Sequence, residues 1–524
     1  MKLRTIVKIA ITSSVVLLCS GFALYSFFRL SAAEGQKDFN LYELVPSTTS
    51  AVFVTDDVLE FVAEVDELTC SKNQQYLYVS KLFSYLKQSL YALSEDTPHG
   101  LSRQMNQMLI SFHEPDNERN QVLYCRLGNG DKELVNRFVR KYISSLYPPK
   151  TFIYKGEEII IYPMADGDFL ACYLTSDFMA LSFQKKLIEN VIDAYKSGKS
   201  LADDSTFTGI RAPKKSAAAA TIYTRMQGMM GWTEFDMKMK DDFIYFSGIT
   251  HDADTCFAFI NQLRQQQSVK GFPGEVLPST AFYFSRQGIT DWVSLLSYGN
   301  AQGQSVPART SEVQNRDKEF SRYLMENAGQ DLVACLFQRE DTLQGAAAVL
   351  SLSVADVTEA ERMLRALVNA APADEGRRNP RITFCYTVNK AYPIYRLPQT
   401  TLFEQLTSFA EPTLDVYAAF YGGRLLLAPD ADALAHYIRQ LDKGEVLNGA
   451  MAYQTGMDHL SDSYHFMLMA DFDHIFQQSE NHVRFVPDFF LRNADFFRHF
   501  TLFVQFACAD GMVYPNIVLK YKSE

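Results

Sequence analysis

The sequence predicts an α+β protein in which one N-terminal transmembrane helix is followed by two tandem repeats of an α+β unit with antiparallel sheets. Three observations lead to this fold class. A long apolar run follows a short basic segment at the N-terminus. Beyond it, strand hairpins are interspersed with helices rather than alternating with them one by one, which is typical of antiparallel sheets. The order of strands, turns and helices in the first half then recurs in the second half.

The first element is an apolar stretch over residues 9–28 that contains no charged residue. A helix rises about 1.5 Å per residue, so roughly 20 residues span a hydrocarbon core of about 30 Å. Lys2, Arg4 and Lys8 precede the stretch, and the positive-inside tendency places such a flank in the cytoplasm. We therefore expect residues 1–8 to form a cytoplasmic tail, the apolar stretch to anchor the chain in the inner membrane, and the bulk of the chain to be periplasmic.

Two alternatives exist for this segment. A cleaved signal peptide has an apolar core of about 7–15 residues and a small-residue cleavage site. Ser31-Ala32-Ala33 would serve as that site, but the apolar stretch is long for a signal peptide, which favours a retained anchor. Lipidation at Cys19 is excluded because a bacterial lipobox needs a small residue just before its cysteine, and Leu18 occupies that position.

The composition is that of an ordinary globular protein, with 47% hydrophobic and 21% charged residues. A length of 524 residues suggests two or more domains. The formal net charge of −11 argues against a nucleic-acid partner, because phosphate binding needs a basic face.

Eight cysteines occur, and the seven beyond the apolar stretch cannot all pair within one chain. Most lie inside apolar runs such as residues 123–127 and 506–508, where a free cysteine behaves as a small buried hydrophobe. No CxxC pair is present, so neither a thioredoxin-like redox motif nor a cysteine zinc knuckle is supported.

The repeat is clearest in a hairpin that occurs once in each half. Residues 170–182 and 416–428 both consist of two apolar segments around a tight turn. The turn is Ser176-Asp177 in the first half and Gly422-Gly423 in the second. The glycine pair supplies the positive φ angles that a short hairpin turn needs. We therefore expect two antiparallel strands in each segment.

A helix follows each hairpin in the same register. Its apolar residues recur at helical spacing. They are Ile188, Val191, Ile192 and Tyr195 in the first half, and Leu434, Tyr437, Ile438 and Leu441 in the second. Both helices end at a glycine, Gly198 or Gly444, which is the usual left-handed cap. Leu201 and Phe207 after the first glycine then correspond to Leu447 and Tyr453 after the second.

The flanking regions also match. Each half opens with a Pro-Ser-Thr motif, at Pro46 or Pro278, followed by a strand. In the middle, a strand near Val122 or Val349 leads into an amphipathic helix, and each half closes with a pair of strands. We expect the helix after Val349 to open with a capping box formed by Thr358 and Glu361.

These matches define two predicted repeats, at residues 41–265 and 275–522. The segment between them contains Gly271, Pro273 and Gly274, as expected of a linker.

The opening motif Val45-Pro46-Ser47-Thr48 with its strand and short helix resembles a family of envelope proteins, known mainly from Bacteroidetes and called domain of unknown function 3352. The segment of residues 198–207 that follows a strand and a helix is also similar to this family. The second half departs from the pattern, because residues 448–452 replace the polar residues found in the first. The resemblance implies location and fold, and it implies no activity.

Three short patterns suggest catalysis but are incomplete. Gly198-Lys199-Ser200 lacks the earlier glycine of a phosphate-binding loop, since Asp193 occupies that position, and it follows a helix. Two SxxK patterns begin at Ser84 and Ser182, but the SDN and KTG elements of penicillin-binding enzymes are missing. Ser182 is also replaced by Ala428 in the second half. No GxSxG nucleophile elbow is present.

Histidines cluster near the C-terminus, at His459, His465, His474, His482 and His499. None of them forms an HExxH motif or another pair at helical ligand spacing. On a strand, Asp471 and Asp473 would share one face and could bind a cation, but the aligned first-half segment begins with Arg225 and cannot do so. A solvated strand end is the alternative. We therefore predict no catalytic, cofactor-binding or metal-binding residue.

The sequence thus predicts a membrane-anchored, periplasmic, non-catalytic binding or scaffolding protein of the cell envelope. Its expected partners are the membrane, through the N-terminal helix, and an envelope protein or a lipid. One alternative is a carrier of lipid or another apolar ligand in a cleft between the two repeats. A less favoured alternative is a periplasmic hydrolase that uses Ser182 or the Asp471–His474 segment.

Overall fold

The computed structural model describes residues 39–522 outside a set of gaps. These gaps are 74–104, 114–118, 129–130, 139–146, 165–166, 212–217, 226–230, 252–257, 294, 296–310, 340–345, 371–380, 389, 399, 402, 404–405, 408–414, 479–485 and 487. The predicted anchor at residues 9–28, with its alternative cleavage site and Cys19, lies outside the described residues, as do Ser84 and His482. Within the described part, no helix is both long and apolar enough to cross a membrane.

One sheet of twenty strands, with every described pairing antiparallel, forms the centre of the structure. From its edge to the middle, the first half contributes β4 (Lys150–Tyr154), β5 (Glu157–Pro163), β6 (Phe169–Leu174), β7 (Phe178–Ser182), β3 (Gln121–Arg126), β2 (Met108–Phe112), β1 (Ala51–Thr55), β8 (Ala220–Thr224), β9 (Trp232–Lys240) and β10 (Phe243–His251). The predicted α+β class with antiparallel pairing is confirmed.

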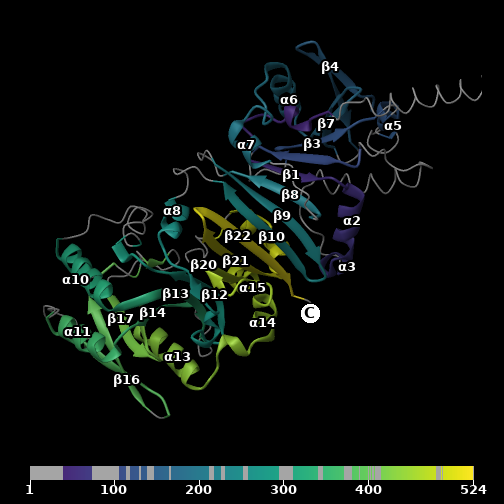
Figure 1. The fold of residues 1–524 in the computed structure, drawn as a ribbon. Helices are drawn as coiled ribbons and strands as arrows, with labels where there is room; N and C mark the ends of the chain where they lie inside the picture. Colours follow the sequence, from purple (N-terminus) through teal and green to yellow (C-terminus); the bar gives the residue numbers. More distant parts are fainter. Residues whose placement is uncertain are drawn as a thin grey trace, which may run out of the picture.

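The second half builds the rest of the sheet in the same order. From the opposite edge it contributes β15 (Ile382–Tyr386), β16 (Ala391–Pro398), β17 (Asp415–Tyr421), β18 (Arg424–Ala428), β14 (Ala346–Val354), β13 (Ala328–Gln338), β12 (Ala281–Gly288), β20 (Phe466–Asp471), β21 (Phe500–Ala509) and β22 (Met512–Tyr521). Each half has a hairpin at its outer edge and a long hairpin, β9–β10 or β21–β22, at the middle. The two halves therefore share one topology, visible as two lobes joined through these central strands (Figure 1).

The halves meet where β10 pairs with β22. Each central hairpin turns at an aspartate with positive φ, Asp241 at 50° and Asp510 at 52°. Ser247 and Asn516 each lie six residues after that aspartate, and they are direct partners in the β10–β22 pair. The Ser247 hydroxyl donates to Asn516 Oδ1 at 3.0 Å. Because equivalent antiparallel strands pair at equivalent positions, an approximate two-fold axis passes between these two residues.

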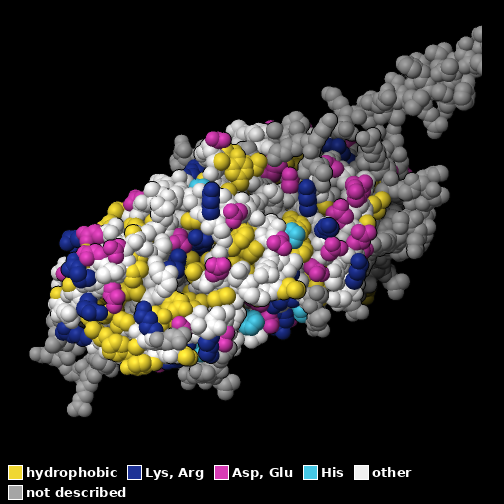
Figure 2. Space-filling view, turned by 60° about the horizontal axis from the view of Figure 1, so that its bottom comes forward, with side chains coloured by type: hydrophobic (Ala, Val, Ile, Leu, Met, Phe, Trp, Pro, Cys, Tyr) yellow, Lys and Arg dark blue, Asp and Glu magenta, His cyan; other side chains and the backbone are white. Residues whose placement is uncertain are grey.

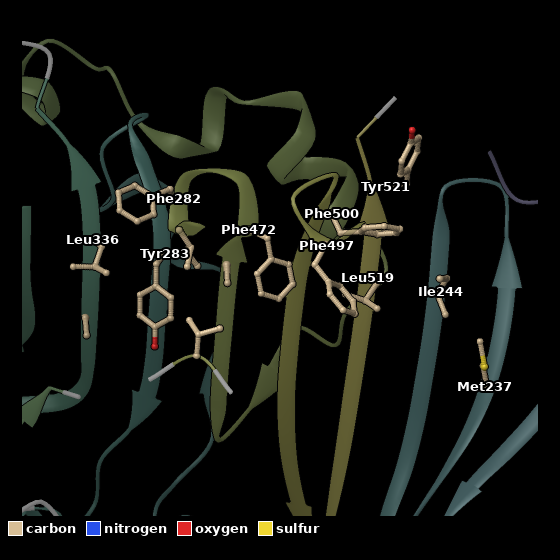
Figure 3. Packing of buried hydrophobic residues seen from close by; sticks show 14 of the residues in the cluster. Met237, Ile244, Phe282, Tyr283, Leu336, Phe472, Phe497, Phe500, Leu519 and Tyr521 are labelled. Carbon is tan, nitrogen blue, oxygen red and sulfur yellow. The ribbon is translucent and has the colours of Figure 1, made fainter. Parts of the chain in front are cut away.

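Helices cover both faces of the sheet. One face carries a single core that continues across both halves (Figure 3). Its helices are α2 (Val58–Glu67), α3 (Thr69–Lys72), α5 (Asp131–Phe138), α10 (Ser311–Asn327), α11 (Val357–Ala370), α15 (Phe472–Phe476), α17 (Asp488–Arg492) and α18 (Ala494–Phe497). This shared core ties the halves together by burial of apolar area.

The opposite face carries two separate cores, one in each half. The first-half core lies under η1 (Leu41–Leu44), α6 (Lys185–Ser197) and α7 (Ser205–Ile210). The second-half core lies under η3 (Pro273–Glu275), α13 (Ala431–Asp442), η4 (Leu447–Gly449) and α14 (Met451–Met457). Two remaining elements lie near the join: α8 (Ala258–Arg264), whose Phe259 contacts Phe466 and Phe506, and the short pair β11 (Val269–Lys270) and β19 (Ser463–Tyr464).

The predicted hairpin-and-helix block is confirmed in each half. The glycines at the ends of α6 and α13 are left-handed, with φ of 62° at Gly198 and 75° at Gly444. Just beyond them, the N–H of Leu201 donates to the Val45 carbonyl at 2.8 Å. In the second half, the N–H of Leu447 donates to the Leu277 carbonyl at 2.9 Å. The chain therefore returns to its opening motif in the same way in both halves.

Two local predictions are wrong. The cap of α11 is Asp356 rather than Thr358, because Asp356 Oδ1 accepts from the N–H groups of Thr358 and Glu359 at 3.0 and 3.1 Å. Glu361 instead accepts from the Tyr395 hydroxyl at 2.7 Å. Asp471 and Asp473 do not share a strand face, because β20 ends at Asp471 and α15 begins directly after it.

The visible surface carries acidic and basic side chains interspersed, and hydrophobic side chains gather at the left end of the view, over the second half (Figure 2). The outer hairpin of this half exposes Phe384, Tyr386 and Val388.

Candidate functional site

A cavity of about 370 Å³ lies in the first half, on the face that carries η1 and α7. Its floor is formed by residues of β1, β2, β8 and β9. Of these strands, β1, β8 and β9 lie side by side in the sheet (Figure 1). Successive residues of a strand point to opposite faces of a sheet. In β9 this alternation places Glu234 and Asp236 on the same face as the fully buried Trp232. In the register of the sheet, Glu234 faces Tyr223 and Asp236 faces Thr221 on β8.

The remaining charged groups come from the ends of other elements. Asp56 follows β1, Arg126 ends β3, and Arg211 is the C-terminal cap of α7. The Arg211 guanidinium lies over the ring of Tyr42, which belongs to η1, with its central carbon 3.9 Å from the ring centroid. The cavity is thus lined by three carboxylates and two guanidinium groups that come from distant parts of the chain.

Two tyrosine side chains at this cavity are largely buried. Tyr42 and Tyr223 are each 7% exposed, and both line the cavity. Neither hydroxyl forms a hydrogen bond with any residue that the structure describes. Neither oxygen belongs to the fully buried side-chain atoms that lack a partner, so both are open to the space of the cavity. A polar ligand would form hydrogen bonds with them there in place of water.

The pKa shifts of the two tyrosines show that they lie near each other and near the charged groups of the cavity. Burial raises the pKa of Tyr42 to about 12, and nearby Arg211 opposes this shift. Burial also raises the pKa of Tyr223, and the neighbouring Tyr42 and Glu234 raise it further. Both hydroxyls are therefore protonated near neutral pH, so each can donate a hydrogen bond and accept one.

A second cavity of about 290 Å³ adjoins the first, since Glu234 and Asp236 line both. It reaches Ser247 and Asn516 at the join between the halves, and Tyr514 of β22. Its charged lining residues are the two shared carboxylates, without a lysine or arginine among the described ones. Together the cavities form a polar site, here called the junction site, that runs from α7 to the approximate two-fold axis.

The short sequence patterns do not form a site. Ser182 is fully buried, and its hydroxyl donates to the Gln121 carbonyl at 2.7 Å. It also accepts from the N–H of Gln184 at 3.1 Å, just before α6. Gly198-Lys199-Ser200 forms the end of α6, as the helix-cap interpretation predicts.

The late histidines and aspartates are structural where they are described. Asp471 caps α15 and forms ion pairs with His474 at 3.4 Å and with Lys522 at 2.7 Å. His465 Nδ1 accepts from the N–H of Cys508 at 3.1 Å. No group of three potential metal ligands occurs in the described part of the chain.

One serine–histidine contact in the structure was not predicted from the sequence. Ser111 Oγ lies 2.9 Å from His113 Nε2 and 3.1 Å from the Tyr124 hydroxyl. Burial lowers the pKa of His113 to about 4, so the ring is neutral near pH 7. Ser111 and Tyr124 are fully buried, so a substrate could not reach this serine. The contact is a buried hydrogen-bond network rather than a catalytic pair.

The described cysteines are free, and five of these six are buried: Cys70, Cys125, Cys172, Cys335 and Cys385. Burial raises the pKa of Cys125 and of Cys172 to about 12. These thiols are therefore unreactive small hydrophobes, as predicted.

The junction site was also missed, although one signal for it is present in the sequence. Residues 232–236 alternate so that two carboxylates share a face with a tryptophan. A tryptophan side chain is usually largely buried, so this pattern indicates that the face is an interior one. No protein-family model, curated protein or solved structure matches the chain.

Proposed function

We propose that the chain is a membrane-anchored, non-catalytic binding protein of the cell envelope that holds a polar ligand in the junction site. Residues 9–28 would anchor it in the inner membrane, with residues 1–8 in the cytoplasm and the two repeats in the periplasm. The observation that carries the binding function is a cavity lined by five charged side chains, where the hydroxyls of Tyr42 and Tyr223 have no hydrogen-bond partner among the described residues. Polar groups that converge on one cavity from distant parts of the chain are typical of a ligand site.

The polarity of the junction site favours this proposal over a carrier of lipid. Glu234 and Asp236 line both of its cavities, and an apolar chain placed there would desolvate these carboxylates. The mainly apolar pocket between α10 and α11 is only about 30 Å³, which is too small for a lipid chain. A hydrolase has less support still, because Ser182 is inaccessible and Asp471 is engaged as a cap.

We further propose that the two halves arose by duplication of one unit and that the chain is similar to the envelope family named above. The identical strand order of the halves supports the duplication. The matching contacts of Pro46 with Ser200 and of Pro278 with Val446 also support it.

Native mass spectrometry of the full chain, solubilised from its own membranes, tests the binding function. We expect a small polar molecule to be retained by the unmodified protein. It should be lost from a double variant, Tyr42→Phe with Tyr223→Phe, which removes only the two unpartnered hydroxyls. Tyr124→Phe is the matched control, because that hydroxyl is bonded to Ser111 outside the cavity. The proposal fails if the unmodified protein carries no ligand and a pull-down also recovers no envelope partner.

Reporter fusions test the topology. Alkaline phosphatase joined after residue 522 should be active, because it folds only outside the cytoplasm, and a fluorescent protein at the same point should be dark. The reverse result would place the repeats in the cytoplasm and overturn the proposed location.

A further inference from the structure

Two charged side chains at the junction site lack a partner of opposite charge. The Arg211 guanidinium, among the residues that the structure describes, donates to the neutral side chain of Asn40 at 3.4 Å and forms no ion pair. The Asp236 carboxylate accepts from the Thr221 hydroxyl at 3.1 Å and has no cation beside it in the described structure. Both groups line the first cavity, so one positive and one negative charge face the same space.

Charges held in a partly buried site are stabilised by a counter-charge, because the surrounding protein screens them less than water does. A ligand with a carboxylate at one end and an ammonium group at the other would neutralise both Arg211 and Asp236. The planar guanidinium also suits two parallel hydrogen bonds to a carboxylate. The second cavity extends the acidic end, since its charged lining residues are Glu234 and Asp236.

The size of the site limits the ligand. Cavities of about 370 and 290 Å³ fall in or near the range of roughly 300–1,000 Å³ that is typical of small-molecule sites. The hydroxyls of Tyr42 and Tyr223 belong to the same cavity, and Tyr223 is near both Arg211 and Asp236, since each of them affects its pKa. The two hydroxyls are suited to the carbonyl and N–H groups of a peptide bond, because a hydroxyl can both donate and accept.

We infer that the junction site binds a small zwitterion, an amino acid or a short peptide, with its carboxylate at Arg211 and its ammonium group at Asp236. This inference rests on the proposed binding function and adds the class of ligand.

Isothermal titration calorimetry of the full-length protein in detergent tests this class. The probes are alanine, alanylalanine and trialanine, then N-acetyl-alanylalanine and alanylalanine amide, and glucose as an uncharged polar molecule. We expect at least one of the three zwitterions to bind. Its N-acetylated form, without the ammonium charge, and its amide form, without the carboxylate, should each bind at least tenfold more weakly. Binding of glucose as tightly as the peptides would overturn the inference.

Variants assign each end of the ligand. Asp236→Asn should weaken binding of the zwitterion about tenfold but leave binding of the N-acetylated form unchanged. Arg211→Gln should weaken the zwitterion similarly and leave the amide form unchanged. Arg225→Gln is the matched control, since Arg225 also lies over an aromatic ring, that of Trp232 at 4.9 Å, but does not line the cavities. Equal losses for all three peptide forms would contradict the assignment.

Failure of this inference can be separated from failure of the proposed function. If no zwitterion binds but native mass spectrometry finds a retained ligand that depends on Tyr42 and Tyr223, the site binds another class of molecule. If neither experiment detects a ligand, this inference fails, and the proposed function fails with it when the pull-down also recovers no envelope partner.

Discussion

The two halves of the molecule have the same strand order, but large side chains fill the second half at the place where the first half has a polar cavity. Glu234 and Phe503 occupy matching positions, each seven residues before the turn aspartate of its central hairpin, Asp241 or Asp510. Glu234 lines the cavity, whereas Phe503 is fully buried in the second-half core.

The same exchange occurs around this position. Tyr42 and Gly274 match, since each lies four residues before the proline of its opening motif, and Tyr453 fills the space beside the glycine. A Cβ added to Gly274 would lie 2.7 Å from the Tyr453 ring. Gly456 on α14 likewise leaves room for Phe503, and the matching residue on α7 is the buried Ile210.

The pairing of partly buried charged side chains also differs between the two halves. In the second half, Asp331 lies between Arg286 and Arg424, with contacts of 3.1 and 3.3 Å, so these charges are paired. Burial opposes ionisation of Asp331, but Arg424 and its other neighbours outweigh burial and lower its pKa. In the first half, Arg211 faces a cavity instead. The comparison teaches that the fold does not require the cavity, because the second half forms the same strands with Phe503 and Tyr453 filling the equivalent space.

The largest effect on stability is expected when the carboxylate of the first half is placed at the matching position in the second-half core. Phe503→Glu should destabilise the protein by about 3–5 kcal/mol, because the charge would be buried without a partner. Urea denaturation followed by fluorescence measures this change, and Phe503→Leu, which keeps an apolar side chain, is the control. An unchanged midpoint for Phe503→Glu would show that this region is not packed as described.

Acid should weaken the first half through His113. Its folded pKa of about 4 lies below the unfolded value of about 6.5, so the unfolded chain takes up the proton first. The contribution of His113 to the unfolding free energy is therefore fully present above pH 6.5. It is lost as the pH falls toward 4, and the loss is no more than about 3 kcal/mol. Hydrogen exchange should increase in β2 and β3 before it does in β13 and β14. In the variant His113→Gln, acid should no longer increase exchange in β2 and β3 before it does in β13 and β14. If these two strands still exchange first, His113 is not the cause.

A smaller change tests the close packing of α14. Gly456→Ala should cost about 1–3 kcal/mol despite the better helix propensity of alanine, because its Cβ would lie 2.3 Å from the Phe503 ring. Gly449→Ala is the matched control, since nothing lies within 4 Å of the added carbon. Combining Gly456→Ala with Phe503→Leu should restore part of the thermal midpoint. Additive losses in the double variant would argue against the contact.

The smallest expected effect separates two kinds of buried tyrosine. Tyr124→Phe should cost about 1 kcal/mol, because it removes a hydrogen bond with Ser111. Tyr42→Phe should leave the unfolding free energy of the ligand-free protein within about 0.5 kcal/mol, because its hydroxyl has no partner to lose. Equal losses at the two positions would mean that the Tyr42 hydroxyl is already satisfied in the free protein.

Much of the local structure was predictable because its causes are local. The turn at Gly422-Gly423 and the ends of α6 and α13 depend on backbone angles that glycine adopts easily. The cap of α11 was assigned to Thr358 because a capping box also fits that sequence, but Asp356 lies nearer the true start of the helix. Asp471 was placed on a strand because alternation alone does not show where a strand ends.

The sequence by itself determined the hairpins, the helices that follow them and the correspondence between the halves, since these depend on residues that are close together in the chain. Only the tertiary structure decided that β10 and β22 join the halves into one sheet, and that the first half encloses a cavity. Whether space beneath a helix is filled depends on the summed volumes of side chains brought together from far apart, such as Tyr42, Arg211 and Glu234. The correspondence that matches Glu234 with Phe503 therefore does not show that the first side chain lines a cavity and that the second fills the equivalent space in the other half.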